Sequence, residues 1–560
     1  MRLVECVPNF SEGRDRAVID AIAEAIRGTE GVELLDVDPG RDTNRTVVTF
    51  IGPPESILEA AFRAISKAAE RIDMRRHQGA HPRMGATDVC PFVPVAGITM
   101  EECAELARRL GQRVGDELGI PVYLYEAAAR RPERRNLADI RKGEYEGLAA
   151  KLADPAWAPD FGPARFNEKS GATVIGAREF LIAYNFNLNT RDQKIAHDIA
   201  LEIREAGRAA KNEHGETLKD ESGKTVMRPG KFKHVKAVGW YIPDYSCAQI
   251  SMNLTDYKQT PLGPVFDEVC RLAEERGVRC TGSELVGLAP KACLLEAGRH
   301  FLRKAGKSAG VPEKELIRVA VQSLGLAELG PFDPQKKIID NRIPDPRPLI
   351  SRSVRDFADE LSSDSPAPGG GSVAALLGSL SAALAAMVAQ LTVGKKGYEA
   401  LQDEMKRLAE EAQPLKDRLL CAVDEDTAAF NAVMAAAKLP KGTPEQKAAR
   451  ERAMNAAARG ALEVPRRVLA MAGEALELAR RAARGNANSL SDAGTAAACA
   501  RAAGEGAYQN VLINLPSFPD ADEKVRIRAE AKERIEEIRS GTAALLAEIE
   551  GRLLSASEKA

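Results

Sequence analysis

Aromatic residues and net charge are both scarce in this chain of 560 residues. Phenylalanine, tryptophan and tyrosine together make up 5% of it, and the formal net charge at pH 7 is −2. So few rings weigh against a platform on which nucleic-acid bases stack. A balanced charge also provides no general attraction for nucleic acid or for an anionic membrane surface. We therefore expect neither a nucleic acid nor a membrane as the partner of this protein.

Close cysteine pairs are missing as well. The nine cysteines are scattered, their number is odd, and no CxxC spacing occurs. This pattern indicates reduced thiols and is not typical of a disulfide framework or of a zinc site. The first residues also lack the apolar run of a signal peptide, because Glu5 stands where that run would lie. Together these absences predict a cytoplasmic protein.

Charged residues are absent from 365–394, a stretch long enough to raise the question of a membrane-spanning helix. Its larger apolar residues recur at steps of three and four, which places them on one face of a helix. These residues are Val373, Leu376, Leu377, Leu380, Leu384, Met387, Val388 and Leu391. Serine and alanine fill other positions, as they do where helices of a bundle approach closely. We expect a buried helix of a soluble bundle.

The chain is longer than one hydrophobic core usually supports, and its composition and hydrophobic periodicity change along its length. Up to residue 333, strand-like and helix-like stretches alternate, with a proline-rich break near residue 160. Beyond residue 352, alanine dominates and long segments keep helical spacing. We therefore predict an α+β N-terminal region of two mixed-sheet subdomains, 1–160 and 161–333. A proline-rich linker at 334–352 would join it to an all-α helical bundle at 353–560.

The segment 77–95, HQGAHPRMGATDVCPFVPV, holds two of only six histidines in a glycine-containing loop before an apolar strand. Loops held by a rigid sheet commonly carry reactive groups. A neutral imidazole accepts a proton near physiological pH, so His81 is a candidate general base. On the residues alone, a histidine that makes one structural hydrogen bond is the more frequent case. The spacing of His77 and His81 also allows shared metal ligation, although Gly79 and Pro82 disfavour the helix that this needs.

Three further N-terminal side chains are candidates for holding a substrate. Asn9 lies in a loop that follows a strand and precedes a helix, where it can present a polar group. Arg45 follows a turn that carries carboxylates, and either Arg45 or Arg83 can grip a substrate carboxylate with two hydrogen bonds. A helix cap or a surface ion pair explains each of them equally well.

Two segments of the helical region are also candidates. Gly369, Gly370, Gly371 and Ser372 lead directly into a helix, whose N-terminus favours an anion and whose glycines allow close approach of the backbone. The segment lacks the lysine of a nucleotide-binding P-loop. Asp426 is one of three consecutive acids inside an apolar helical stretch, where burial can tune an acid for proton transfer. A tight loop and solvent-facing acids are the alternatives.

Several motifs together resemble the formimidoyltransferase-cyclodeaminase family over nearly the whole chain. They are LVECVPNFSEG (3–13), the segment 77–95, WAPDFGP (157–163), GSELVGL (282–288), APGGGSVA (367–374) and NVLINL (510–515). The resemblance implies two α/β subdomains around a folate-binding channel, followed by a helical cyclodeaminase domain. It also reverses the interpretation of His81, which matches the transferase histidine of that family. The segment 211–233 is longer than in the animal forms of the family.

The resemblance implies roles for further residues. Asp38 matches an aspartate placed near that histidine, and Asp426 matches the cyclodeaminase acid. The folate-binding stretch of the family matches Gly162, Pro163, Ala164, Arg165, Phe166, Asn167, Glu168, Lys169, Ser170 and Gly171. Tetrahydrofolate is then a co-substrate, and neither a metal nor a nucleotide cofactor is implied. Self-association through the helical domain is expected, because the family assembles as rings of dimers.

The implied function is that of a bifunctional folate enzyme of histidine degradation. It transfers the formimidoyl group of N-formimidoyl-L-glutamate to tetrahydrofolate, including folates with polyglutamate tails. It then cyclises the adduct to 5,10-methenyltetrahydrofolate with release of ammonia. Two alternatives stay open on the sequence: only one of the two domains is active, or the chain binds folate and holds subunits together without catalysis.

Overall fold

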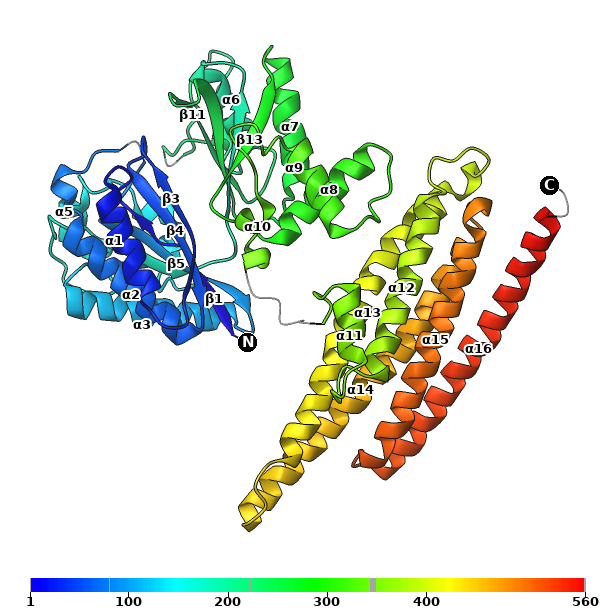
Figure 1. Cartoon of the computed structure of the whole chain (residues 1–560). Helices are drawn as coiled ribbons and strands as arrows, with labels where there is room; N and C mark the ends of the chain where they lie inside the picture. The colour runs from blue at the N-terminus through cyan, green and yellow to red at the C-terminus, as the bar shows by residue number, and fades with distance from the viewer. Residues whose placement is uncertain (1, 80, 222, 343–348, 558–560) are drawn as a thin grey trace. The chain divides into compact units, whose positions relative to one another are not determined.

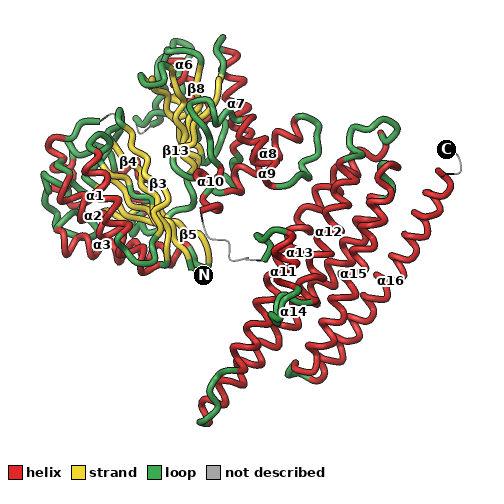
Figure 2. Tube along the Cα trace, in the orientation of Figure 1, coloured by secondary structure: helices red, strands yellow, loops and turns green. Residues whose placement is uncertain are grey.

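The computed structural model describes residues 2–79, 81–221, 223–342 and 349–557. The chain divides into two compact units, one of Met1–Ala297 with Ala320–Ile343 and one of Gly298–Val319 with Pro344–Ala560. The first unit holds the sheets and the second is helical (Figure 1; Figure 2). The predicted fold class, mixed sheets followed by an all-α bundle, is therefore confirmed.

A seven-stranded sheet forms the first part of the first unit. Its strands are β1 (Leu3–Cys6), β2 (Asn9–Phe10), β3 (Glu33–Gly40), β4 (Arg45–Gly52), β5 (Thr87–Ala96), β6 (Val122–Glu126) and β7 (Thr173–Ala177). β7 lies parallel to both β5 and β6, and the other pairs are antiparallel. The helices α1 (Arg16–Arg27), α2 (Pro54–Arg71) and α3 (Met100–Leu118) cover one face, where Cys6, Phe50 and Phe92 are buried among them. Strand alternation turns every second side chain to the opposite face.

The boundary between the two sheet-bearing parts lies later than residue 160. The strand β7 pairs with β5 and β6 of the first sheet, and the second sheet begins with β8 (Ile182–Leu188). Residues 161–177, which we predicted in the second subdomain, thus belong to the first. Prolines near residue 160 mark a loop, but local composition does not reveal to which sheet the next strand returns.

The second sheet has four antiparallel strands in the order β11–β12–β8–β13. Residues 235–242 and 247–254 form a hairpin, in which Val235 of β11 lies opposite Leu254 of β12. The remaining elements are β11 (Val235–Ile242), β12 (Cys247–Leu254), β13 (Cys280–Val286), α6 (Gln193–Ile203) and α7 (Leu262–Glu275). The exposed segment 211–233 ends near a short ladder of β9 (Arg208–Ala209) with β10 (Met227–Arg228).

The described parts of the predicted linker at 334–352 pack on one or the other unit. α10 (Pro334–Lys337) and the 3₁₀ turn Ile339–Arg342 pack on the first unit, where Ile338 forms a bridge with Ala289. Arg342 Nη1 donates a hydrogen bond to Leu35 O over 2.9 Å. At the other end, the backbone N–H of Leu349 donates to Asp424 Oδ1 of the helical unit over 2.9 Å. The part of this linker at 343–348 lies outside the described residues.

The second unit is a bundle of long helices. They are α11 (Val354–Leu361), α12 (Gly370–Gln390), α13 (Gln402–Ala437), α14 (Pro444–Ala482), α15 (Leu490–Asn514) and α16 (Ala521–Ser557). The segment between α8 (Lys291–Lys304) and α9 (Glu313–Ser323) groups with this bundle, and Gln390 Nε2 donates to Gly310 O over 2.8 Å. Alanines such as Ala382, Ala412 and Ala500 fill the core, so the helices approach one another closely.

Among the described helices, α12 is the one long and apolar enough to cross a membrane by length and composition. However, 61% of the most apolar 18-residue stretch of this helix is buried inside the bundle. The small residues Ser372, Ala375, Ser379, Ala382 and Ala386 are all buried, as predicted for close contacts between helices. Three of the larger residues lie on an outer face, where Leu380, Met387 and Leu391 are 47%, 38% and 50% exposed, whereas Val388 is buried.

Glu5 lies on β1 between β4 and β5, and it is only 4% exposed. Burial raises the pKa of this carboxyl to about 7, against a smaller opposing effect of Arg178. The folded protein therefore binds this proton more tightly than the unfolded chain, and its stability falls as pH rises from about 4.5 to about 7. We expect Glu5→Gln to raise the free energy of unfolding by roughly 3 kcal/mol at pH 8 and to change it little at pH 4.

Urea unfolding followed by tryptophan fluorescence measures this effect, because both tryptophans of the chain, Trp157 and Trp240, lie in the first unit. Glu30→Gln is the matched control, since Glu30 is exposed. An equal gain for Glu5→Gln at pH 4 and pH 8 would show that the buried charge is not its cause.

Candidate active sites

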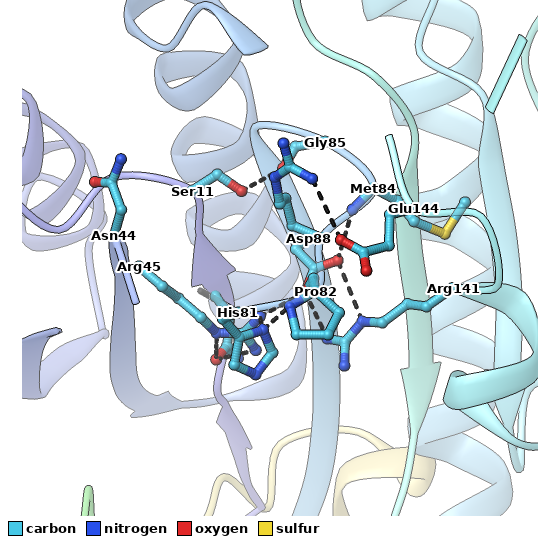
Figure 3. A network of polar contacts seen from close by, with 12 residues as sticks. Ser11, Asn44, Arg45, His81, Pro82, Met84, Gly85, Asp88, Arg141 and Glu144 are labelled. Atoms are coloured by element: carbon cyan, nitrogen blue, oxygen red, sulfur yellow. Dashed lines mark hydrogen bonds and ion pairs between the residues drawn. The ribbon is translucent and has the colours of Figure 1, made fainter. Parts of the chain in front are cut away.

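His81 lies in the loop between the 3₁₀ turn Met74–Arg76 and β5 (Figure 3). Its Nδ1 is 2.7 Å from Pro82 O and 3.0 Å from Arg45 Nη1. Pro82 O only accepts hydrogen bonds and the guanidinium of Arg45 only donates them, so Nδ1 can bond to only one of the two at a time. The mechanism proposed below uses the tautomer in which the ring proton is on Nδ1 and Pro82 O accepts it. Nε2 then carries the lone pair, and it has no hydrogen-bond partner among the described residues.

The surroundings of His81 keep its imidazole neutral. Burial lowers the pKa of His81 to about 3, and the positive charges of Arg45 and Arg141 add to this effect. The negative charge of Asp88 opposes the shift without cancelling it. The imidazole is therefore uncharged at neutral pH and has a free Nε2, which is the state that a proton acceptor requires.

Asp88 is the acid beside His81, and the sequence analysis did not single it out. It is 1% exposed at the start of β5. Its carboxylate accepts hydrogen bonds from Arg45 Nη1 over 2.6 Å, Arg141 Nη2 over 2.5 Å and Met84 N over 3.0 Å. Burial alone would raise its pKa, but Arg141 and Arg45 outweigh burial and hold the pKa below its usual range. Its place in the segment 77–95 was the available signal in the sequence.

The structure brings Asn9 and Arg45 to His81, and it places Asp38 on a neighbouring strand. Arg45 Nη2 and Nε both donate to Asn9 Oδ1, over 2.6 and 3.0 Å. The guanidinium is thus held by Asn9 and Asp88, and its contact with a substrate carboxylate stays a prediction. Asp38 lies on the edge strand β3, opposite Val47. Within the described part of the chain it makes no hydrogen bond to His81.

Arg83 is also paired within the chain. It is 8% exposed and donates to both carboxylate oxygens of Glu146, over 2.6 and 2.8 Å, and to His77 Nδ1 over 3.1 Å. His77 Nε2 in turn lies 2.8 Å from Asn44 O. Both nitrogens of His77 are therefore used, and the two histidines contact different partners. The described residues contain no group of three His, Cys, Asp or Glu side chains that could hold a metal ion.

The stretch 162–171 forms a loop next to the His81 loop. Its end is fixed by backbone contacts, because Ser170 O accepts from Ala86 N over 2.8 Å and Gly171 bridges Gly85. Phe166 packs against Tyr145 with ring centroids 5.3 Å apart. Five of its residues are exposed and open to a ligand: Pro163, Ala164, Arg165, Glu168 and Lys169. Asn167 instead stabilises the loop, since its Oδ1 accepts from Ser170 N over 3.0 Å.

The motif WAPDFGP at 157–163 is held in place by a buried arginine. Arg134 is 1% exposed and donates to Asp160 Oδ2 over 2.9 Å and to Ala158 O over 2.7 Å. Its guanidinium also lies 5.8 Å from the centre of the Trp157 ring. These contacts make the motif a support for the stretch that follows it.

Asp426 lies on α13 and contacts the first turn of α12. Ser372 Oγ is 2.9 Å from Val423 O and 3.1 Å from Asp426 Oδ2. Burial raises the pKa of the Asp426 carboxyl, and hydrogen bonds from Ser372 oppose the shift. A partly buried carboxyl of this kind gives and takes a proton more readily than an exposed aspartate. The site is open at Gly369, where an added Cβ would meet nothing within 4 Å, and Gly370 begins the helix.

The two acids before Asp426 have structural partners. Asp424 accepts from the backbone N–H groups of Leu349 and Ile350, over 2.9 and 3.2 Å. Glu425 forms an ion pair with Arg467 over 2.5 Å. Successive residues of a helix point in different directions, so one acid of the three contacts the start of α12.

The two sites define a two-domain enzyme, with a neutral histidine on a mixed-sheet unit and a partly buried aspartate in a helical bundle. Family models match successive parts of the chain. Residues 3–178 match the formiminotransferase domain, N-terminal subdomain, and residues 183–344 match the formiminotransferase domain. Residues 353–533 match formiminotransferase-cyclodeaminase. The interval between the first two models agrees with the boundary between the two sheets.

Relatives extend this match to the whole chain. The formimidoyltransferase-cyclodeaminase of Rattus norvegicus is 44% identical over 556 residues, which are 98% of this chain and 99% of that protein. A glutamate formimidoyltransferase of Streptococcus pyogenes serotype M1 is 42% identical over 302 residues, 54% of this chain and 94% of its own. A methenyltetrahydrofolate cyclohydrolase of Methylorubrum extorquens is 38% identical over 189 residues, 34% of this chain and 88% of its own. This chain belongs to the formimidoyltransferase-cyclodeaminase family.

Proposed function

We propose that this chain is a bifunctional enzyme of histidine degradation. It transfers the formimidoyl group of N-formimidoyl-L-glutamate to tetrahydrofolate, its co-substrate, and cyclises the product to 5,10-methenyltetrahydrofolate with release of ammonia. One observation carries the proposal: a single chain holds both sites, each with an ionisable group suited to its step. These groups are the neutral imidazole of His81 and the carboxyl of Asp426, whose pKa is raised by burial.

In the first step, N5 of tetrahydrofolate attacks the formimidoyl carbon of the donor. His81 Nε2 takes the proton from N5 as the new C–N bond forms. The bond from this carbon to the glutamate nitrogen then breaks, and the imidazolium gives the proton to that nitrogen. Asp88 holds the guanidinium of Arg45 by an ion pair, and Arg45 in turn lies against the ring of His81. We place the folate along the exposed residues of 162–171, beside this loop.

In the second step, N10 of the folate attacks the carbon of the transferred formimidoyl group and closes the five-membered ring. The formimidoyl group enters this step as its protonated amidinium form. Asp426 takes the proton from N10 and passes it to the departing nitrogen, which leaves as ammonia, and the methenyl product keeps the positive charge. Ser372 holds the carboxyl toward the open start of α12. Neither step changes an oxidation state, so neither needs a redox cofactor.

Gly371 allows the Asp426 carboxylate to approach α12. A Cβ at position 371 would lie 2.2 to 2.6 Å from the carboxylate atoms of Asp426. We expect Gly371→Ala to displace this carboxyl and to slow cyclisation about 100-fold, because small misplacements of a reacting group have effects of this size. Formimidoyl transfer should keep its rate. Gly473→Ala on α14 is the control, since nothing lies within 4 Å of a Cβ there, and equal cyclisation rates for both variants would contradict the argument.

The proposed function is tested by incubating the full chain with N-formimidoyl-glutamate and tetrahydrofolate. The absorbance of methenyl-folate reports the complete reaction, and released glutamate reports the first step alone. We expect both signals from the wild type. If glutamate is released but no methenyl-folate forms, only the transferase site is active. If the chain binds folate but gives neither signal, it is a folate-binding protein and not an enzyme.

We further propose that the helical unit pairs with a second copy of the chain through the outer face of α12. Leu380, Met387 and Leu391 are exposed on this face. A row of exposed apolar side chains along one helix is typical of a subunit contact. We expect Leu380→Glu with Met387→Glu to yield smaller assemblies by analytical ultracentrifugation. Val525→Glu, at a 70% exposed position of α16, is the control, and an unchanged mass for the double variant would contradict this pairing.

A further inference from the structure

A cavity beside the His81 loop has a lining that the mechanism above does not use. Its volume is about 470 Å³, and it is lined by Gln78, Gly79, Arg83, Gly143, Glu144 and Glu146. Gln78 and Gly79 come from the same loop as His81, three and two residues before it. With one guanidinium and two carboxylates, the lining carries a net negative charge.

The two glutamates of this cavity have different partners. Glu146 pairs with Arg83 through both of its oxygens, over 2.6 and 2.8 Å. Glu144 is reached by one nitrogen of Arg83, over 3.3 Å. The other oxygen of Glu144 has no partner among the described residues, and its side chain is 43% exposed. Glu146 thus neutralises Arg83, while Glu144 keeps acceptor capacity for a ligand.

The backbone fixes Glu144 between this cavity and the His81 network. Glu144 N donates to Arg141 O over 2.8 Å, and the guanidinium of Arg141 binds Asp88 over 2.5 Å. Tyr145 N donates to Arg83 O over 2.9 Å, which ties the same turn to the His81 loop. Glu144 itself has a φ of 53°, a left-handed conformation that few residues other than glycine adopt. Figure 3 shows Glu144, Asp88, Arg141 and His81 in this one network.

We propose that this cavity receives the formimidoyl end of the donor as a planar amidinium cation, with the carboxylate of Glu144 as its partner. This inference rests on the proposed function and names the group that selects its donor. An amidine is protonated near neutral pH, and its two parallel N–H groups match a carboxylate as a guanidinium does. Protonation also makes the formimidoyl carbon more electrophilic. The cavity therefore distinguishes an amidinium from a neutral formyl group of the same shape.

Isothermal titration calorimetry of the full chain with two donors tests this selection. N-formyl-glutamate is the probe, because it replaces the N–H of the formimidoyl group by oxygen and carries no positive charge there. We expect the wild type to bind N-formimidoyl-glutamate about 10- to 100-fold more tightly than N-formyl-glutamate, as for a hydrogen bond between charged partners. Glu144→Gln should abolish this preference and leave the affinity for N-formyl-glutamate unchanged.

Three comparisons separate the outcomes. Glu30→Gln, at an exposed site, should keep the wild-type preference, and Glu144→Asp should keep part of it. Glu144→Asn is a second neutral variant, since asparagine adopts a left-handed backbone more readily than glutamine does. A wild-type preference in both neutral variants would overturn the assignment of Glu144 alone. A wild type that binds neither donor would overturn the proposed function and this inference with it.

Discussion

His81→Ala is expected to slow formimidoyl transfer about 10²- to 10⁴-fold, the range that a positioned general base contributes. The reason is the free Nε2 of a neutral imidazole, which alanine cannot replace. Glutamate release in the presence of tetrahydrofolate measures the step. Cyclisation of added 5-formimidoyltetrahydrofolate should keep its rate, because Asp426 lies in the other compact unit.

The matched control is His214→Ala, since His214 is exposed in the segment 211–233. The pH profile provides a second check. Because the pKa of His81 is lowered to about 3, kcat/KM for transfer should show no inflection from this histidine between about pH 5 and pH 8. Suppose instead that activity falls below about pH 6.5, and that this fall persists when each of the other histidines is replaced. His81 would then titrate in its ordinary range. Full transfer activity in His81→Ala would remove it from the mechanism.

Asp426→Asn is expected to stop the reaction after its first step. Asparagine keeps the shape of the side chain but cannot exchange a proton, so cyclisation should fall about 10²- to 10⁴-fold. Glutamate should still be released, and 5-formimidoyltetrahydrofolate should accumulate without the absorbance of methenyl-folate. A single turnover with excess enzyme separates the two steps most clearly.

Glu425→Gln is the control for this variant, because Glu425 is the adjacent acid and pairs with Arg467. It should form methenyl-folate at the wild-type rate. Methenyl-folate formed at that rate by Asp426→Asn would show that another group moves the proton. A slow transfer step in the same variant would instead indicate that the two units depend on each other.

The local pattern of apolar residues was sufficient to predict most of the helices and strands. The pairing of 236–242 with 248–254 follows from two apolar alternations separated by a short turn, and the structure has this hairpin. The long helices follow from spacing and from glycine or proline at their ends, as in α14, which begins at Pro444. The boundary at residue 160 was wrong, because β7 joins a sheet whose other strands lie far away in the sequence.

Some features of the sites could likewise be predicted from local sequence, and others could not. His81 was recognisable from its loop, and Asn9 and Arg45 from theirs. Their common network was not, since Arg45 meets Asp88 across 43 residues of sequence and Asp88 meets Arg141 across 53. Asp38 lies on the edge strand β3, and its nearness to His81 stays a prediction. Arg141 and Glu144 belong to no motif that the sequence analysis recognised.

The amino-acid sequence by itself determined the two kinds of architecture, the order of most helices and strands, and the family, because these depend on periodicity and on motifs of neighbouring residues. Only the tertiary structure decided which charges surround each reactive group. Burial between Arg45 and Arg141 makes His81 a neutral base, and burial against α12 raises the pKa of Asp426. These effects depend on desolvation and on distances between residues remote in the chain, and the linear pattern of residues contains neither.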